Sequence, residues 1–387
     1  MTGALSTITV GLRVGPGFPP AAPGYLMRAL RGVEVTQQDS APCGFQLTFL
    51  TEVVSAGSAF KIVSEPLLAP FNRVLLRVSV NGAPQTLIDG FITHHQYVST
   101  NGPDDSQFVV TGEDISVAMD VVDNSREFPS MPDAAVAEAV LAPWVALGIV
   151  PLVIPPPTSL VPVDYVPQQT GTDRSLLQSL AGANGAMFYI TPTPTPFLNQ
   201  AYWGPPNRTT PPSAVLDVDV GSESTVDSFT AQYDALAPQT FLGESIETTV
   251  EPYEPVPIAT ATSTRFPPLA ADPALQQSPL FTRHSLWRDD QLEPASAMLQ
   301  AQMRTNVSTD NVVTIGCGFA PARLGAVVNA PAVVGVRGTG EAYDGLYYAK
   351  SASHRITLLA DQGFDYNQQL TLTREGTGST VTVLEPS

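Results

Sequence analysis

The chain has 387 residues, which suffices for two or three domains and at least one sizeable hydrophobic core. Hydrophobic residues make up 43% of it and exclude a disordered chain, whereas only 14% of the residues are charged, well below the roughly one quarter typical of soluble domains. Soluble proteins with so few charges usually cover much of their surface in an oligomer or a larger assembly, so we expect self-association.

The charge balance is strongly acidic, with 36 acidic against 18 basic residues and a net charge of −18. Lys61 and Lys350 are the only lysines, and no run of basic residues occurs. Proteins that bind nucleic acid neutralise its phosphates with lysine and arginine, so the composition argues against specific nucleic-acid binding. An acidic wall would instead let an anionic polymer or a folded cargo pass through a conduit without sticking.

The cysteines and the lengths of the apolar runs indicate in which cellular compartment the protein is expected. Cys43 and Cys317 lie far apart, and we expect two reduced, buried thiols, although the sequence leaves a disulfide open. The first residues lack the basic start and apolar stretch of a signal peptide, which predicts cytoplasmic synthesis. No run approaches the roughly 18 to 20 apolar residues of a membrane-spanning helix, so stable membrane insertion is not expected.

The pattern of residues 1–125 predicts an N-terminal segment followed by a first β-domain. Phe45, Leu47 and Phe49 alternate with polar residues, as the buried face of a strand does. Asn81-Gly82 separates two strand-like runs, which is a strong hairpin signal. Several short strands at close spacing favour a sandwich or a barrel. The predicted strands cover residues 6–14, 45–49, 72–80, 85–98 and 107–114, and residues 25–35 lead into a further strand.

Residues 126–214 predict an α/β insertion with proline-rich connectors. A first helix starts at Pro132, and an extended proline-rich connector follows it. A second helix covers residues 172–185, with Thr172 as its N-cap and an apolar leucine stripe along one side. A strand over residues 187–190 is expected to pack against this helix.

Residues 215–387 predict a second β-domain. Residues 245–285 lack a regular pattern, so we expect an irregular excursion at about 245–310. No repeat of fixed period occurs, yet the two β-domains follow a similar course of strands. The predicted strands cover residues 216–220, 226–234, 312–315, 326–336, 346–349 and 366–374, a helix covers 293–303, and Asp344-Gly345 predicts a turn.

The histidines offer no catalytic or metal-binding constellation. His94 and His95 are adjacent in a predicted strand, so their side chains point to opposite faces of the sheet and are not placed to share a metal ion. His284 and His354 have no carboxylate partner at a telling spacing. We expect structural or surface roles for all four.

The acidic and glycine-rich segments also fall short of known site patterns. The cluster formed by Glu113, Asp114, Asp120 and Asp123 lacks the glycine and the ligand spacing of a calcium loop, which predicts a solvated strand end. Residues 335–340 match a phosphate-binding loop only in their glycines, because no P-loop lysine follows them. We therefore expect no catalytic residue, no metal ion and no cofactor.

Three segments follow one another in an order that occurs in one protein family. The first joins an acidic residue and a leucine-rich helix to an aromatic strand, the second is an alternating strand, and the third is an aromatic strand that leads to a histidine and to a last strand ending in arginine. The residues concerned are Asp173, Leu176, Leu177, Leu180, Phe188 and Tyr189, then Phe229 and Tyr233, then Tyr343, Gly345, Tyr347, His354 and Arg374. Over roughly residues 40–376 the chain resembles the late control gene D proteins, and the resemblance implies structural roles for these side chains.

Proteins of that family are central baseplate hubs of contractile-tailed phages, and the hub portions of type VI secretion spike proteins and of extracellular contractile injection systems are similar. The resemblance implies a mainly β fold with α/β insertions, in which two tube-type β-barrel domains per chain assemble as a ring. It implies a homotrimer that joins the tail tube protein to a separate spike protein, contacts other baseplate proteins and leaves a central channel for cargo or DNA. The particle would be a phage virion tail or a contractile injection system.

Two other classes of protein compete with the hub interpretation. A tail-associated adhesin or carbohydrate-binding β-protein would share the strand-rich pattern. A cell-wall hydrolase would need a pair of catalytic carboxylates, and nothing in the sequence selects two of the 36 acidic residues.

Overall fold

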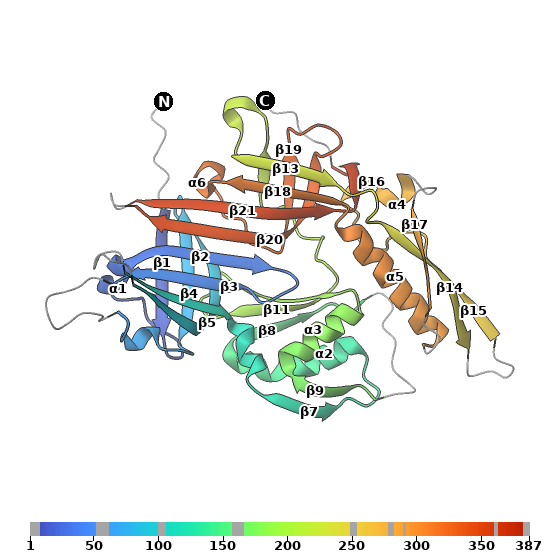
Figure 1. Ribbon diagram of the computed structural model, residues 1–387, viewed down its shortest axis with the longest axis horizontal. Coiled ribbons are helices and arrows are strands. Elements are labelled where there is room, and N and C mark those ends of the chain that lie inside the picture. The colour runs from blue at the N-terminus through green and yellow to red at the C-terminus, as the bar shows by residue number, and fades with distance from the viewer. Residues whose placement is uncertain are drawn as a thin grey trace.

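The computed structural model describes residues 8–51, 62–99, 106–156, 166–247, 254–277, 282–288, 292–359 and 363–381. Strands predominate, as expected, and a twelve-stranded sheet runs through the molecule (Figure 1). Its main path is β1 (Ile8–Gly15), β4 (Arg73–Val80), β5 (Ala83–Val98), β6 (Gln107–Asp114), β3 (Gly44–Leu50), β2 (Leu30–Gln38), β20 (Gly345–Leu358), β21 (Phe364–Arg374), β18 (Val313–Phe319) and β13 (Ser228–Tyr233), and β19 (Ala332–Arg337) and β12 (Val215–Asp217) branch from β20.

The sheet consists of two halves with the same strand order. The N-terminal half-sheet contains β1 to β6, and the C-terminal half-sheet contains β12, β13 and β18 to β21. Numbered by their order along the chain, the six strands of each half lie side by side as first, fourth, fifth, sixth, third and second. Four of the five ladders are antiparallel in both halves, whereas β1–β4 is antiparallel and β12–β19 is parallel. The expected similarity between the two halves is therefore confirmed.

A β-bulge occurs in the same ladder of both half-sheets. The pairing of β5 with β6 shifts between Ile92 and His94, and the pairing of β20 with β21 shifts between Ala349 and Ser351. Thr93 and Lys350 are thus the extra residues. These bulges give a common origin for counting equivalent positions in the two halves.

The two half-sheets join through antiparallel pairing of β2 with β20, from Gly32 opposite Thr357 to Gln38 opposite Ser351. The first part of β20 pairs with β19 on the same edge. The described strands therefore form one continuous sheet, and none of their ladders closes either half into a barrel. We call the β2–β20 ladder the half-sheet junction.

Each half-sheet has its own hydrophobic core. Phe45, Leu47 and Phe49 are buried in the first core, as their alternation predicts, and the second core contains Ile315 and Leu372. Removing a leucine or phenylalanine side chain from water stabilises the fold by about 1.5 to 3 kcal/mol. The predicted Asn81-Gly82 turn also forms, with positive φ at both residues.

An α/β insertion follows β6 and has a third core. Leu177 and Phe188 are buried in it, and Thr172 caps the second helix because its hydroxyl accepts a hydrogen bond from the Ser175 N–H. The insertion contains β7 (Asp123–Glu127), α2 (Asp133–Leu141), β8 (Ile149–Val153), β9 (Gln168–Thr172), α3 (Asp173–Ala183), β10 (Met187–Pro192) and β11 (Asn199–Gly204).

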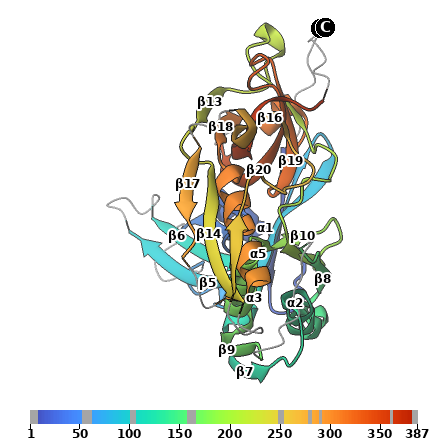
Figure 2. The ribbon, with the colours of Figure 1, turned by 90° about the vertical axis from the view of Figure 1, so that its right-hand side faces the viewer.

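The segment expected to be an irregular excursion contains regular structure, so that prediction is wrong. A three-stranded sheet packs against a helix and projects from the body of the molecule (Figures 1 and 2). We call this unit the arm. It consists of β14 (Gln239–Glu247), β15 (Glu254–Ala259), β17 (Arg283–Leu286) and α5 (Pro294–Asp310). The sequence pattern did not predict β15 because it contains Pro255 and Pro257. Proline argues against a strand, except where its missing N–H faces an open edge.

Other departures from the expected elements are local. Residues within 25–35 begin with a helix, α1 (Gly24–Ala29), before the strand. The predicted turn, strand and second strand of residues 344–357 form one long strand, β20, after a loop with positive φ at Gly338 and Gly340. The remaining short elements are β16 (Ala270–Pro273), α4 (Ala274–Gln277), α6 (Pro321–Leu324) and β22 (Gly376–Ser379).

Candidate functional site

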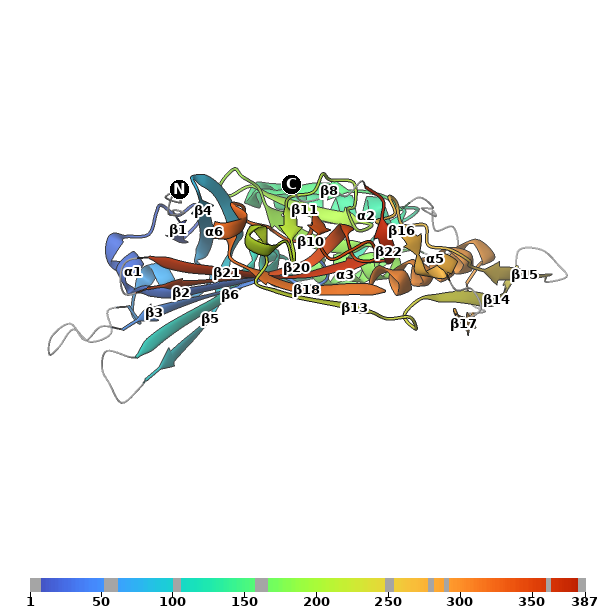
Figure 3. The same cartoon turned by 90° about the horizontal axis from the view of Figure 1, so that it is seen from above.

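Each half-sheet has an open edge, and the two edges, on β5 and β13, correspond to the two strands that pair at the half-sheet junction, β20 and β2. Beyond its bulge, β5 pairs only with β6, and β13 pairs only with β18, among the strands described. Seen from above, the end of β5 and the edge strand β13 lie along the same side of the molecule (Figure 3). An unpaired edge presents a row of backbone N–H and C=O groups and is a template for pairing with another strand.

The half-sheet junction is the internal counterpart of these open edges. His354 of β20 lies opposite Val35 of β2 and is fully buried. Its Nε2 lies 3.2 Å from Gln37 Oε1, and its Nδ1 lies 2.9 Å from the hydroxyl of Tyr366. Because Gln37 Oε1 can only accept, the network assigns the proton to Nε2 and makes Nδ1 the acceptor of the Tyr366 hydroxyl.

Burial lowers the pKa of His354 to about 3. The imidazole is therefore neutral at physiological pH and ties the two half-sheets together without a charge. Gln37 completes the tie, because its side chain donates to Leu87 O at 2.8 Å and accepts from Ala330 N at 2.9 Å. The sequence predicted a structural or surface role for His354, and the structure places it in the interior.

One face of the sheet is lined by uncharged polar side chains, and we call it the polar face. Cross-strand partners share a face, so the register identifies its members on the eight central strands. The charged side chains there have partners: Glu34 pairs with Arg355 at 2.8 Å, Glu113 pairs with Arg174 at 2.7 Å, and Asp365 accepts a hydrogen bond from Asn367 at 3.0 Å. The uncharged polar members include Thr36, Gln46, Thr48, Gln96, Thr111, Ser228, Thr230, Gln232, Thr314, Ser353, Thr357, Asn367, Gln369 and Thr371.

Three other family-signature residues meet around the buried Arg374. Its guanidinium donates to the carbonyl oxygens of Ala342, Asp344 and Gly376 at 2.8 to 2.9 Å. It also lies 4.3 Å from the ring centroid of Tyr347, whose hydroxyl donates to Tyr343 O at 2.6 Å. A Cβ at Gly345 would lie 2.8 Å from the Arg374 guanidinium, and its φ is +130°, so glycine is required there. This arrangement fixes the loop before β20.

Asp173 anchors the insertion from the first turn of α3. It is buried, and its carboxylate accepts hydrogen bonds from Asn124, Trp144 and Gln169 at 2.8 to 3.0 Å. Arg126 adds an ion pair at 3.4 Å. Both carboxylate oxygens have partners within the insertion, so the role of Asp173 is to hold the insertion together.

The other signature residues lie in hydrophobic packing. Leu177 and Phe188 are buried in the third core, with Leu176 and Leu180 packed against it. Tyr189 stacks on Tyr202 with ring centroids 4.9 Å apart. Phe229 and Tyr233 alternate on β13 and pack against the second core.

The acidic cluster predicted as a solvated strand end is instead ordered by specific contacts. Asp114 is buried and accepts hydrogen bonds from the N–H groups of Cys43 and Ser116, and burial raises its pKa. Arg174 pairs with Glu113 at 2.7 Å and also with Asp120. Strand periodicity did not reveal this because the partner arginine lies about 60 residues further along the chain.

Buried arginines that the sequence patterns did not single out connect the parts of the molecule. Arg73 pairs with Asp89 at 2.6 Å, and both side chains are almost fully buried. Arg208 bridges Asp310 at the end of α5 and Glu375 after β21, each at 2.8 Å. Lone arginines in polar segments carry no sequence signal for such pairing.

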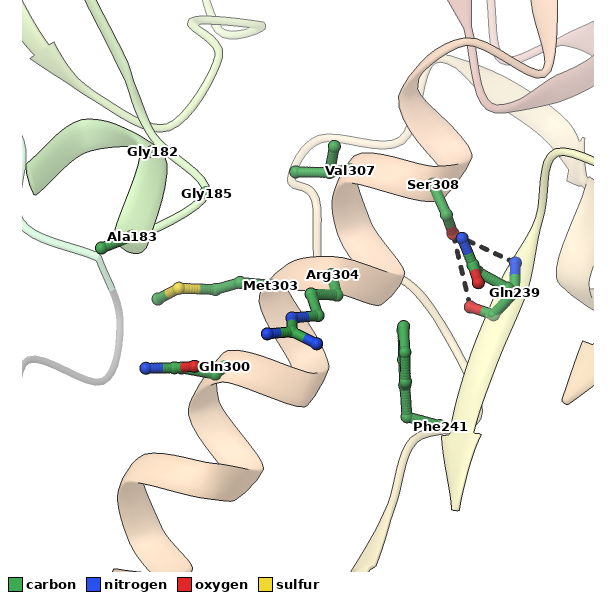
Figure 4. Close-up of a pocket in the computed structure, with 10 residues that line it drawn as sticks. All are labelled: Gly182, Ala183, Gly185, Gln239, Phe241, Gln300, Met303, Arg304, Val307 and Ser308. Carbon is green, nitrogen blue, oxygen red and sulfur yellow. Dashed lines mark hydrogen bonds between the residues drawn. The ribbon is translucent and has the colours of Figure 1, made fainter. Parts of the chain in front are cut away.

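Two cavities in the described part of the chain are lined mainly by uncharged side chains. One cavity of about 480 Å³ lies between the end of α3, α5 and β14 (Figure 4). Among the ten residues drawn there, only Arg304 is charged, and its guanidinium lies 4.9 Å from the ring centroid of Trp287. A second cavity of about 610 Å³ is lined mainly by apolar residues, including Phe266 and Met298.

Neither cysteine pairing nor a metal cluster occurs in the described part of the chain. Cys43 and Cys317 are free and buried in separate cores, which settles the disulfide that the sequence left open. Among the residues with a described structure, no three His, Cys, Asp or Glu side chains come together to hold a metal ion. In the same residues, no helix combines the length and apolarity that crossing a membrane requires.

The chain was compared with known proteins. No protein-family model matches it, and no curated protein matches it. Solved structures do match over almost the whole chain. A tail protein from Neisseria meningitidis MC58 is 16% identical, with 95% of this chain and 97% of that chain covered and a TM-score of 0.61. The 43 kDa tail protein of prophage MuSo2 from Shewanella oneidensis is 12% identical, with coverage of 95% and 99% and a TM-score of 0.62.

A type VI secretion component of E. coli has a similar fold. It is 11% identical, covers 92% of this chain and 76% of its own length with a TM-score of 0.55, and is described as similar to the T4 bacteriophage tail proteins gp27 and gp5. These matches confirm the resemblance to the tail and baseplate hub proteins at the level of the fold. The chain thus has the fold of phage tail proteins and of type VI spike components.

Proposed function

We propose that the protein is a structural baseplate hub of a contractile tail or injection system, built as a homotrimeric ring. The observation that carries the proposal is the repeated strand order of the two half-sheets. A chain with two equivalent half-sheets supplies two of six positions, so three copies form a ring that matches a hexameric tube. Each half-sheet then acts as one tube-type domain of the ring.

The half-sheet junction suggests how the copies join. Inside the chain, β2 pairs with the edge of β20 beyond its bulge. The equivalent strands in the opposite halves are β13 and β5, and both have open edges in the described structure. Repeating the junction between copies pairs β13 of one copy with β5 of the next, and after three copies every β13 edge and every β5 edge of the ring is paired. Counting from the bulges places Ala231 opposite Tyr97 of the next copy.

The polar face would line the central channel of this ring. Hydroxyl and amide groups predominate on this face. They bind a passing polymer or protein less tightly than large apolar or unpaired cationic groups would. The net charge of −18 adds repulsion of an anionic cargo such as DNA. The proposed partners are the tail tube protein on one side of the ring, a separate spike protein on the other, and further baseplate proteins around it.

Non-enzymatic assembly is favoured over the alternatives by the site itself. The buried Asp114 and Asp173 accept hydrogen bonds at both carboxylate oxygens, and no carboxylate or histidine lines the cavity of Figure 4. A carbohydrate-binding adhesin would bind glycans as a monomer or at the periphery of the particle. Binding of a glycan by a strictly monomeric protein would favour that second candidate.

The test is a proline substitution on the edge of β13. Asp234 N donates to Val312 O, so alternate residues along β13 point their N–H toward β18, and the N–H of Ala231 points to the open edge. Ala231→Pro removes a donor needed by the next copy without removing one used inside the chain. We expect a folded monomer in place of the trimer, measured by light scattering and circular dichroism.

A matched control is Ala259→Pro on β15. Thr260 N donates to Phe241 O, so the N–H of Ala259 also points to an open edge, the one that already carries Pro255 and Pro257. This variant is expected to remain trimeric. A trimeric Ala231→Pro protein would contradict the proposed pairing of β13 with β5.

A further inference from the structure

Two of the most exposed apolar side chains lie beside the two open edges. Leu236 is 77% exposed and lies in the turn that leads from β13 into the arm. Phe71 is 69% exposed and precedes β4, and its N–H donates to Ile92 O beside the bulge of β5. Isolated exposed leucines are common, but two large apolar groups beside the two edges that are proposed to pair call for a shared explanation.

The half-sheet junction provides the geometry that links them. At the end of β2, Gln37 is buried and contacts the segment before β19, through Asn329 Oδ1 at 3.3 Å and Ala330 N at 2.9 Å. The end of β2, the second strand of its half-sheet, thus contacts the segment before β19, the fourth strand of the other half-sheet. This contact closes the junction at one end.

Counting from the bulges identifies the residues that would make the equivalent contact between two copies. Counting along the paired strands from Thr93 and Lys350, Tyr233 takes the place of Gln37, and Pro70 takes the place of Ala330. The segment after Tyr233 contains Leu236, and the residue after Pro70 is Phe71. The same count puts Asp234 opposite His94 of the next copy, so a carboxylate faces an imidazole at this point.

We propose that the root of the arm, with Leu236, packs against Phe71 of the next copy and forms an apolar contact between subunits. This inference rests on the proposed trimeric ring and adds to it a contact outside the strand pairing. The internal contact through Gln37 is polar. Between chains, Leu236 lies three residues after Tyr233, the counterpart of Gln37, and Phe71 directly follows Pro70, so the contact there is apolar. The arm therefore starts at the interface rather than away from it.

Cross-linking tests the contact directly. The double variant Leu236→Cys, Phe71→Cys is treated with a short bismaleimide, and the buried Cys43 and Cys317 leave little background. We expect covalent dimers and trimers on a denaturing gel. The matched control is Leu286→Cys, Phe71→Cys, because Leu286 is 67% exposed but lies on the arm sheet away from its root, and this pair is expected to stay uncross-linked.

A substitution supplies the second readout. Leu236→Asp is expected to weaken trimer formation about tenfold or more, measured from the concentration dependence of the mass, because it places a charge in an apolar contact. Leu286→Asp is expected to leave it unchanged. If the protein is trimeric but Leu236→Cys and Phe71→Cys do not cross-link, this inference alone is overturned. The same holds if Leu236→Asp and Leu286→Asp weaken trimer formation equally. A wild-type protein that never forms a trimer overturns the proposed function as well.

Discussion

His354 shows how a single residue joins the two half-sheets. It is buried, neutral and hydrogen bonded to Gln37 and Tyr366, which come from both halves of the sheet. Protonation would place a charge in the interior without a partner carboxylate, and this is the reason that burial lowers the pKa. The histidine therefore stabilises the junction only while it is neutral.

This residue makes the stability depend on pH. The pKa of His354 is about 3 in the fold and near 6.5 when the chain is unfolded, so the unfolded state takes up the proton first. Its contribution is fully present above pH 6.5 and is lost as the pH falls toward 3. Between pH 6.5 and 4.5 we expect wild type to lose about 2 to 3 kcal/mol of unfolding free energy more than His354→Gln.

Denaturant titrations of both proteins at a series of pH values measure this difference. The comparison cancels the groups that the two proteins share, including the buried Asp114. Parallel pH profiles for wild type and His354→Gln would show that the imidazole is already accessible to protons in the folded protein.

Single residues were predictable from the sequence only where local geometry dictates them. The burial of Phe45 follows from strand alternation, whereas the turn predicted at Asp344-Gly345 is wrong, because Gly345 begins β20. The roles of Gln37 and Asp114 could not be predicted from the sequence, because they depend on partners that lie from about 50 to more than 300 residues away along the chain. The Asp114 carboxylate was expected in water for the same reason.

Among the elements, α3 shows how much the sequence can specify. Thr172 caps it, Asp173 occupies the first turn, and the helix ends at Asn184 with Gly185 in the left-handed region. All of these signals are local, and all are confirmed. The arm is the opposite case, since β17 has only four residues and β15 contains two prolines, so neither period nor propensity indicated a sheet.

The cap of α3 offers a prediction at this scale. The Thr172 hydroxyl accepts from Ser175 N at 3.1 Å and donates to Asp120 at 2.6 Å. Thr172→Ala is expected to lower the unfolding free energy by about 1 to 2 kcal/mol. Thr170→Ala, two residues earlier and exposed, should change it by less than about 0.5 kcal/mol. Thermal melts check both values, and equal effects would mean that the cap does not stabilise the helix.

At the scale of the whole molecule, the repeated strand order is the central feature. The sequence indicated two similar β-domains, but not that they share one sheet, because the β2–β20 register joins residues more than 300 positions apart. The domain limits at 125 and 214 remain predictions. The open edges, the polar face and the proposed channel all follow from the same duplication.

The mass and shape of the purified wild-type protein test the central claim most directly. Three chains of 41.0 kDa give about 123 kDa, and we expect this mass by light scattering together with rings of pseudo-sixfold appearance by electron microscopy. A particle of 41.0 kDa at high protein concentration, without rings, would contradict the account.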